Sequence, residues 1–391
     1  MHSKKIKKSL LKLFVFSELM CALYILYYHE YVSDYLNVEA NLDDLYVMVF
    51  FCLILFAYLF YYYSWSGLTF IFERQKKLAP IGNVNILFFI FVVIYLIFVM
   101  KTGVGKVNAS DSASANDLSI FDKLLFLPVI ALKVNYLIYI YAAGCRNKNK
   151  LYYVTIVLFL ICELYRGVSF SILLLAVIEI DKWRKYIRVR NLIVTIPFFL
   201  LFVNIVYNLK FMVRLGDGYE YLNVYQTLVM LMGRLSVISN ILYNYENYTA
   251  ISNFVSINNY NVANEFLEKL TPMPSVFGIH EKTIEFGKLI FWNSYGRPDS
   301  AIAVSILGML AIVPAQAATI IVTLVLSILF IKFTISLLDK TEEQDIVAFF
   351  FVLLTLYQGF WGILANYVYA LFVYLALTSL KQLLSYGGKN V

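Results

Sequence analysis

The chain has 391 residues, of which 61% are hydrophobic, and its formal net charge is +7. Soluble domains are close to half apolar, so this composition, with a mean hydropathy of +0.74, excludes an ordinary soluble domain. Apolar runs near the 20 residues that a helix needs to cross a bilayer recur along the chain. They predict an all-α polytopic membrane protein.

About ten membrane helices are expected, some of them short or re-entrant. In chain order they are 13–29, 45–64, 84–100, 123–143, 151–163, 167–180, 192–208, 315–337, 346–358 and 364–380. The polar stretch before the run at 315–337 is too long for an ordinary turn. We therefore expect N-terminal membrane helices at 1–208, a large, partly helical extracytoplasmic loop at 209–314, and C-terminal membrane helices at 315–391.

Lysine and arginine set the expected orientation. They collect at the N-terminus, at 74–77, at 146–150, at 182–190 and at the C-terminus. Basic loops stay in the cytoplasm, so the positive charge reports topology and no nucleic acid is expected as a partner. No small-residue cleavage site follows the first apolar run, which we therefore expect to be a retained helix.

Two segments predict short hairpins. Basic clusters flank 151–180, and an even number of crossings keeps both in the cytoplasm, with a turn near residues 163–167. Each arm has about 13 residues, or about 20 Å against a hydrocarbon core of about 30 Å. The turn, with Arg166, is therefore expected in a recess below the outer surface, and 346–380 predicts a similar turn at 359–362.

The loop itself should contain helices. Its expected elements are a helix with an apolar face at 223–243, mixed helical structure at 244–268, a break at 271–274, a charged loop at 279–291, and a dipping or surface-lying helix at 300–313 that Pro314 ends.

Arginines near the bilayer are the candidate ligands for a phosphate or pyrophosphate group. They are Arg166, Arg214, Arg234 and Arg297. Charges in or beside a membrane are costly and usually mark function, and the guanidinium fork matches phosphate oxygens. The plain alternatives are a pair of Arg166 with Glu163, an interfacial anchor at Arg214 and a polar helix face at Arg234.

Candidate proton acceptors for a hydroxyl nucleophile are His280, Glu281 and Asp299. Each also fits a solvated loop position. Asp43 and Asp44 have two interpretations as well: a catalytic or metal-binding pair, as in some membrane glycosyltransferases, or a solvated acidic loop.

Other kinds of site find no support. The only histidines are His2, His29 and His280, and no cluster has metal-ligand spacing, so neither a metal nor a cofactor is expected. No nucleotide-binding glycine loop and no serine hydrolase motif is present. The four cysteines lie in spans or on the inner face, and no disulfide framework is expected.

The overall plan, the arginine-bearing turn at 164–167 and the spacing Arg297-x10-Gly308 together resemble the bacterial O-antigen and oligosaccharide repeat-unit polymerases, relatives of the O-antigen ligases. The plan covers most of the chain. Members often carry two Arg-x10-Gly elements, whereas one is found here, and Tyr165 stands where the family has serine.

The resemblance implies a GT-C-like fold and a metal-independent glycosyltransferase in the bacterial inner membrane, with its active site on the extracytoplasmic side. The implied partners are an undecaprenyl-pyrophosphate-linked oligosaccharide donor and acceptor, the bilayer and a chain-length regulator. Arg166, Arg214, Arg234 and Arg297 would stabilise the leaving pyrophosphate, while Asp299, Glu281 or His280 would orient or deprotonate the acceptor hydroxyl.

Two alternatives stay open. A polyprenyl-phosphate-dependent glycosyltransferase would use Asp43 and Asp44. A transporter or flippase of lipid-linked sugars predicts internal repeats and short loops. No repeat is visible and one loop is large, so the pattern favours polymerase chemistry.

Overall fold

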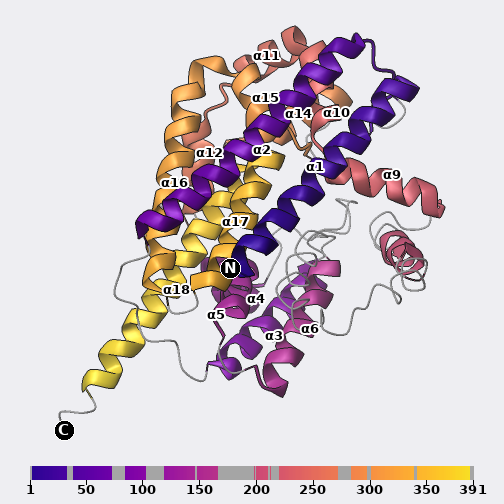
Figure 1. Ribbon diagram of the computed structural model, residues 1–391. Coiled ribbons are helices and arrows are strands. Elements are labelled where there is room, and N and C mark those ends of the chain that lie inside the picture. Colours follow the sequence, from indigo (N-terminus) through magenta and orange to yellow (C-terminus); the bar gives the residue numbers. More distant parts are fainter. Residues whose placement is uncertain are drawn as a thin grey trace. The chain divides into compact units, whose positions relative to one another are not determined.

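The computed structural model describes residues 2–32, 38–72, 84–102, 119–145, 148–165, 198, 200–209, 212, 220–271, 283–296, 301–338 and 341–387. Within these ranges the chain is helical and contains no strand (Figure 1). Two compact units are present. Unit 1 comprises Met1–Gln75, Leu228–Ser336 and Ala348–Tyr369, and unit 2 comprises Lys76–Thr227, Leu337–Val347 and Ala370–Val391.

Five of the described helices are long and apolar enough to cross a membrane, which confirms a helical, membrane-embedded protein. They are α1 (His2–Tyr28), α2 (Asp44–Phe72), α3 (Asn85–Thr102), α16 (Ala317–Leu337) and α18 (Trp361–Gly387). They correspond to the predicted spans 13–29, 45–64, 84–100, 315–337 and 364–380. Two further predicted runs form α6 (Lys150–Tyr165) and α17 (Thr341–Gln358).

The run predicted as a span at 123–143 forms two helices in place of one, and together they are apolar and long enough for a broken span or a re-entrant loop. The structure has α4 (Ile120–Ala131) and α5 (Val134–Gly144), bent by 47° at the break. Lys133 has a φ of 49°, a left-handed conformation that ends a helix. The predicted span 167–180 lies outside the described residues, and of 192–208 the structure describes mainly the apolar helix Leu200–Leu209.

In unit 2, α3 packs against α4, α5 and α6. A buried carboxylate lies among these helices: Glu163 of α6 accepts hydrogen bonds from the hydroxyls of Tyr95, at 2.8 Å, and Tyr139, at 3.4 Å. A second polar contact joins Asn85 to Asn149 at 2.8 Å. Such internal partners are needed because lipid offers none.

Unit 1 contains most of the predicted loop, which is largely helical. Its helices are α9 (Val224–Arg234), α10 (Ile238–Glu246), α11 (Tyr248–Ile257), α12 (Val262–Leu270), α14 (Phe286–Tyr295) and α15 (Ser305–Ile312). Of the segment 300–313, predicted as a dipping or surface-lying helix, Ser305–Ile312 is helical and forms α15, which ends just before Pro314.

Two loop predictions were wrong. The single helix at 223–243 is broken at residues 235–237, between α9 and α10. The charged loop at 279–291 contains the start of α14, because Phe286, Leu289 and Ile290 form a buried helical face that outweighs the neighbouring charges.

Helix α10 lies beside α1, α2 and α15 and packs against them (Figure 1). Its first turn is bonded to Glu18, in the middle of α1. Its last residue, Glu246, accepts a hydrogen bond at 2.6 Å from Tyr31, just beyond the end of α1. Helix α10 therefore runs beside the second half of α1, within the packed helices of unit 1.

The predicted turn at 359–362 is confirmed between α17 and α18. Gly359 has a φ of 70°, and a Cβ there would lie 3.1 Å from the carbonyl oxygen of Ser305. The ring of Tyr357, two residues earlier, contacts Phe14 with centroids 5.4 Å apart. Because Phe14 lies near the middle of α1, this turn lies deep in unit 1. The arms are longer than predicted, since α17 has 18 residues and α18 has 27.

Candidate functional site

Most of the predicted site residues lie outside the described part of the chain. These are Arg166, Arg214, Arg297, His280, Glu281 and Asp299, and their roles stay predictions. Arg234 and Gly308 are described, and both belong to unit 1. The local structure around these two residues defines the candidate site.

Arg234 is the last residue of α9, and its side chain is exposed. It directly precedes residues 235–237, here named the elbow, where the chain turns from α9 into α10. The Tyr357 hydroxyl lies 2.5 Å from the Arg234 carbonyl oxygen and 3.1 Å from the Ser236 carbonyl oxygen, and its single proton is shared between these two acceptors. The backbone that carries Arg234 is thus bonded to the end of α17.

The other side of the elbow is bonded to Glu18, which is 1% exposed. Its carboxylate accepts hydrogen bonds from the Ser236 hydroxyl at 2.6 Å, from the Val237 amide at 3.0 Å and from the Ile238 amide at 3.2 Å. The Tyr58 hydroxyl of α2 donates a further bond at 2.9 Å.

This arrangement explains why the chain breaks here. The first amides of a helix have no partner within it, and a carboxylate at that end also interacts favourably with the helix dipole. Glu18 supplies the missing acceptor for the start of α10. The hydrogen bonds of the elbow therefore fix the direction in which the chain leaves α9, and with it the position of the Arg234 backbone.

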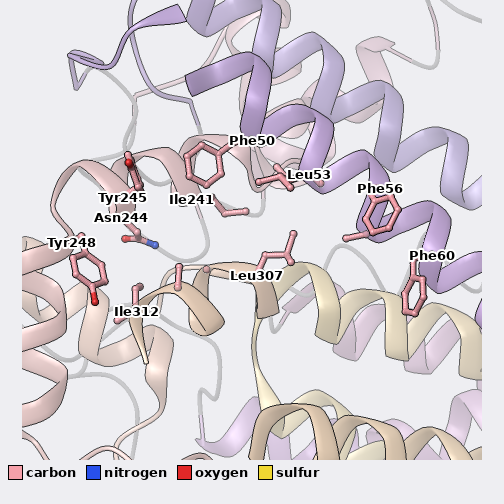
Figure 2. A pocket seen from close by; sticks show the side chains of 14 residues that line it. Phe50, Leu53, Phe56, Phe60, Ile241, Asn244, Tyr245, Tyr248, Leu307 and Ile312 are labelled. Carbon is pink, nitrogen blue, oxygen red and sulfur yellow. The ribbon is translucent and has the colours of Figure 1, made fainter. Parts of the chain in front are cut away.

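An apolar groove of about 390 Å³ lies along α2, lined also by α10, α11 and α15 (Figure 2). Asn244, Tyr245 and Tyr248 lie at one end, and Phe56 and Phe60 at the other. Phe56 is 68% exposed and Phe60 65% exposed, so this end of the groove opens sideways from α2. The part of the groove lining that α2 provides belongs to the candidate membrane span Asp44–Thr69.

The two ends of the groove differ in polarity, because one end carries tyrosines and the other carries phenylalanines. Tyrosines collect at the membrane–water interface, where the ring is apolar and the hydroxyl is wet, and the tyrosine end of the groove adjoins the Asp44 end of α2. The phenylalanine end lies towards the middle of the span. The apolar lining suits a hydrocarbon chain.

Gly308 lines the groove where α15 packs against α10. A Cβ at this position would lie 3.0 Å from Val304 Cγ1 and 3.8 Å from Ile241 Cγ1. Its hydrogen bond from the backbone amide to the Ser305 hydroxyl is 3.1 Å long. Since Ile241 belongs to α10, the helix that starts at the elbow also forms one wall of the groove.

Tyr260, Glu265, Lys269 and Glu285 form a polar cluster. Glu265 and Lys269 are on α12, Tyr260 lies just before α12, and Glu285 lies just before α14. Glu265, 1% exposed, accepts hydrogen bonds from the Tyr260 hydroxyl at 2.7 Å and from the Phe286 amide at 3.1 Å. Lys269 Nζ lies 2.5 Å from a carboxylate oxygen of Glu285.

Burial raises the pKa of Glu265 to about 7, although the hydrogen bonds from Tyr260 and Phe286 lower it. Burial also opposes the charge of Lys269, but the attraction of Glu285 prevails and the pKa of Lys269 is raised. The same pair lowers the pKa of Glu285 against the effect of its burial. Glu265 is thus the member of the cluster that is set to exchange a proton near neutral pH.

Asp43 and Asp44, which the glycosyltransferase alternative would use, are both exposed at the start of α2. In the described residues no group of three or more His, Cys, Asp and Glu side chains is placed to hold a metal ion. All four cysteines are free.

Sequence patterns did not single out Glu18, Tyr357 or Glu265. Glu18 is a lone carboxylate in the apolar run 13–29. A lone charge in an apolar run is also the signal that marked Arg166, so the sequence alone could have identified Glu18. Glu265 and Tyr357 carry no such signal, because their burial arises from elements distant in the sequence.

The comparisons with known proteins returned no match: no family model, no curated protein and no solved structure matches the chain.

Proposed function

We propose that the chain is a metal-independent glycosyltransferase that polymerises undecaprenyl-pyrophosphate-linked oligosaccharide repeat units into O-antigen or another surface polysaccharide. The observation that carries the proposal is the double role of α10. At its start lies the elbow with Arg234, and its flank forms the lipid-shaped groove with Gly308. A pyrophosphate-linked lipid needs both a cation and a hydrocarbon groove.

In the proposed reaction, the hydroxyl of the acceptor sugar attacks the anomeric carbon of the donor. The bond between that carbon and the pyrophosphate oxygen breaks, and undecaprenyl pyrophosphate leaves with the electron pair. The acceptor's proton passes to a base, for which Asp299, Glu281 and His280 are the candidates. Arg234, with Arg166, Arg214 and Arg297, stabilises the charge that develops on the leaving group.

The proposal places the enzyme in the bacterial inner membrane with a GT-C-like architecture and its active site on the extracytoplasmic side. The N-terminal lysines, expected in the cytoplasm, are at the opposite end of α1 from Tyr31 and Glu246. By that orientation the tyrosine end of the groove faces away from the cytoplasm, where a chain-length regulator would also act.

The test is the glycan ladder of a host from which the gene is deleted. Complementation with the unchanged gene should restore a ladder of polymer lengths, while Arg234→Ala, Arg166→Ala and Arg297→Ala should leave mainly single repeat units on the lipid anchor. Arg234→Lys should restore the ladder only in part, because lysine keeps the charge but not the two-pronged geometry. Lys8→Ala, at an exposed position on α1, is the matched control for loss of one positive charge.

The proposal fails if every arginine variant polymerises normally. If deletion removes the repeat unit itself, the protein acts earlier, as a polyprenyl-phosphate-dependent glycosyltransferase or as a flippase. Asp43→Asn and Asp44→Asn would then separate the two, since only a transferase using these carboxylates would lose activity.

A further inference from the structure

We propose that Glu18 and Tyr357 are positioning residues that hold the elbow, and through it aim Arg234 at the pyrophosphate. This inference rests on the proposed function, which it deepens. Neither side chain needs to touch the substrate, because both act on the backbone between α9 and α10.

Both the hydrogen-bond donors and the hydrogen-bond acceptors of the elbow have partners. Its amide and hydroxyl donors, from Ser236 and Val237, go to the Glu18 carboxylate. The carbonyl of Ser236, and that of Arg234 just before the elbow, accept the hydroxyl proton of Tyr357. A turn fixed through both its donors and its acceptors has little freedom to rotate, and the direction of the residue that leads into it is fixed as well.

Burial makes these partners necessary. Glu18 and Val237 are each 1% exposed, and Ser236 is 2% exposed. A buried amide or hydroxyl that loses its acceptor destabilises the protein. The break between α9 and α10 therefore persists only where protein groups satisfy its backbone.

Packing fixes the two holding groups themselves. The Phe14 ring contacts Tyr58, with centroids 6.3 Å apart, and Tyr357, with centroids 5.4 Å apart. Tyr58 in turn donates its hydroxyl to Glu18. The side chains that hold the elbow therefore form one packed set from α1, α2 and α17.

The sharpest variant is Tyr357→Phe, because it keeps the ring that packs on Phe14 and removes only the hydroxyl. Tyr61→Phe is the matched control: the Tyr61 hydroxyl is also buried in unit 1 and donates to a backbone carbonyl of α17, that of Phe349, at 2.9 Å. The Tyr61 hydroxyl bonds to α17 at Phe349, eight residues before Tyr357, so a general loss of stability would affect both variants alike.

In a reconstituted assay with a lipid-linked repeat unit, Tyr357→Phe should lower kcat by about tenfold or more, since small misplacements of a catalytic group are costly. Tyr61→Phe should leave kcat close to the unchanged protein. The effect of Tyr357→Phe should disappear when Arg234 is already alanine, because both changes remove the same interaction. An undiminished effect in that background would overturn the inference.

A second experiment does not depend on the reaction. Arg234→Cys, in a chain whose Cys21, Cys52, Cys145 and Cys162 are serine, carries a nitroxide spin label, and its mobility is read from the electron paramagnetic resonance line shape in lipid nanodiscs. Glu18→Gln and Tyr357→Phe should increase the label's mobility, and Tyr61→Phe should not.

The two experiments separate the two ideas. Unchanged mobility in both elbow variants would overturn the positioning role whatever the reaction. Increased mobility, together with normal polymerisation by Arg234→Ala, would instead overturn the role of Arg234 in the proposed function and leave the elbow as the device that orients this side chain.

Discussion

The Ser236 hydroxyl lies 2.6 Å from the Glu18 carboxylate, although the two residues are 218 positions apart. One belongs to the first membrane helix and the other to the turn between two helices of the predicted outer loop. This bond makes the loop an integral part of unit 1, because α10 cannot keep its first turn without a group from α1.

We predict that Glu18→Ala destabilises the protein by about 3 kcal/mol, because buried donors that lose their acceptor cost about 1–3 kcal/mol each. Equilibrium unfolding in detergent, followed by tryptophan fluorescence, measures this. Ser17→Ala is the neighbouring control: Ser17 is also buried, but its hydroxyl bonds within its own helix, to the Leu13 carbonyl. Similar losses in the two variants would contradict a special role for Glu18.

Gly359→Ala should also destabilise the protein, by about 1–3 kcal/mol, because a left-handed backbone strains any residue with a Cβ. At this position the Cβ would also press on the Ser305 backbone at 3.1 Å. Thermal unfolding should show a lower midpoint. Gly67→Ala is the converse control, since a Cβ there meets nothing within 4 Å inside α2, and alanine favours a helix.

The stability of the α12–α14 contact should depend on pH through Glu265. Its folded pKa is about 7, whereas an ordinary glutamate titrates near 4.5, so the folded state holds the proton more tightly. Stability should therefore be greatest below pH 4.5, fall by about 3 kcal/mol between pH 4.5 and 7, and stay level above.

Glu265→Gln tests this prediction, because the neutral amide keeps a similar shape and does not titrate. Unfolding measured from pH 5 to 8 should lose most of its downward slope in the variant. Glu285, whose pKa is lowered, acts in the opposite sense, since its stabilisation is lost only as pH falls below its ordinary value. A variant that keeps the full slope between pH 5 and 7 would assign that slope to another group.

Ala311→Phe should close the groove to a hydrocarbon chain, because Ala311 lines it on α15. Ala318→Phe, an equally exposed position on α16, adds the same ring outside the groove. Labelling by a photoreactive polyprenyl phosphate should fall by about tenfold, or about 1.4 kcal/mol of binding, in the first variant and little in the second. Equal labelling would mean that the lipid binds elsewhere.

Single residues show where sequence patterns reached their limit. Gly359 and Gly362 predicted the turn between α17 and α18, because glycines that interrupt an apolar run are a local signal. The break at 235–237 was missed, because the stretch keeps an apolar helical face throughout and only Glu18, far away in the chain, stabilises the interruption. Helix α14 was missed because Glu285 and Lys288 suggested solvent, whereas they lie beside a buried face.

The sequence by itself determined that this is a helical membrane protein, which runs form its long helices and where its deep turn lies. These properties depend on the transfer of one continuous segment into lipid, and a local window measures that transfer. Only the tertiary structure decided that α10 and α15 pack beside α1 and α2, that Glu18 and Tyr357 hold the elbow, and that Gly308 opens onto a groove. These depend on contacts between segments hundreds of residues apart, and no local window contains both partners.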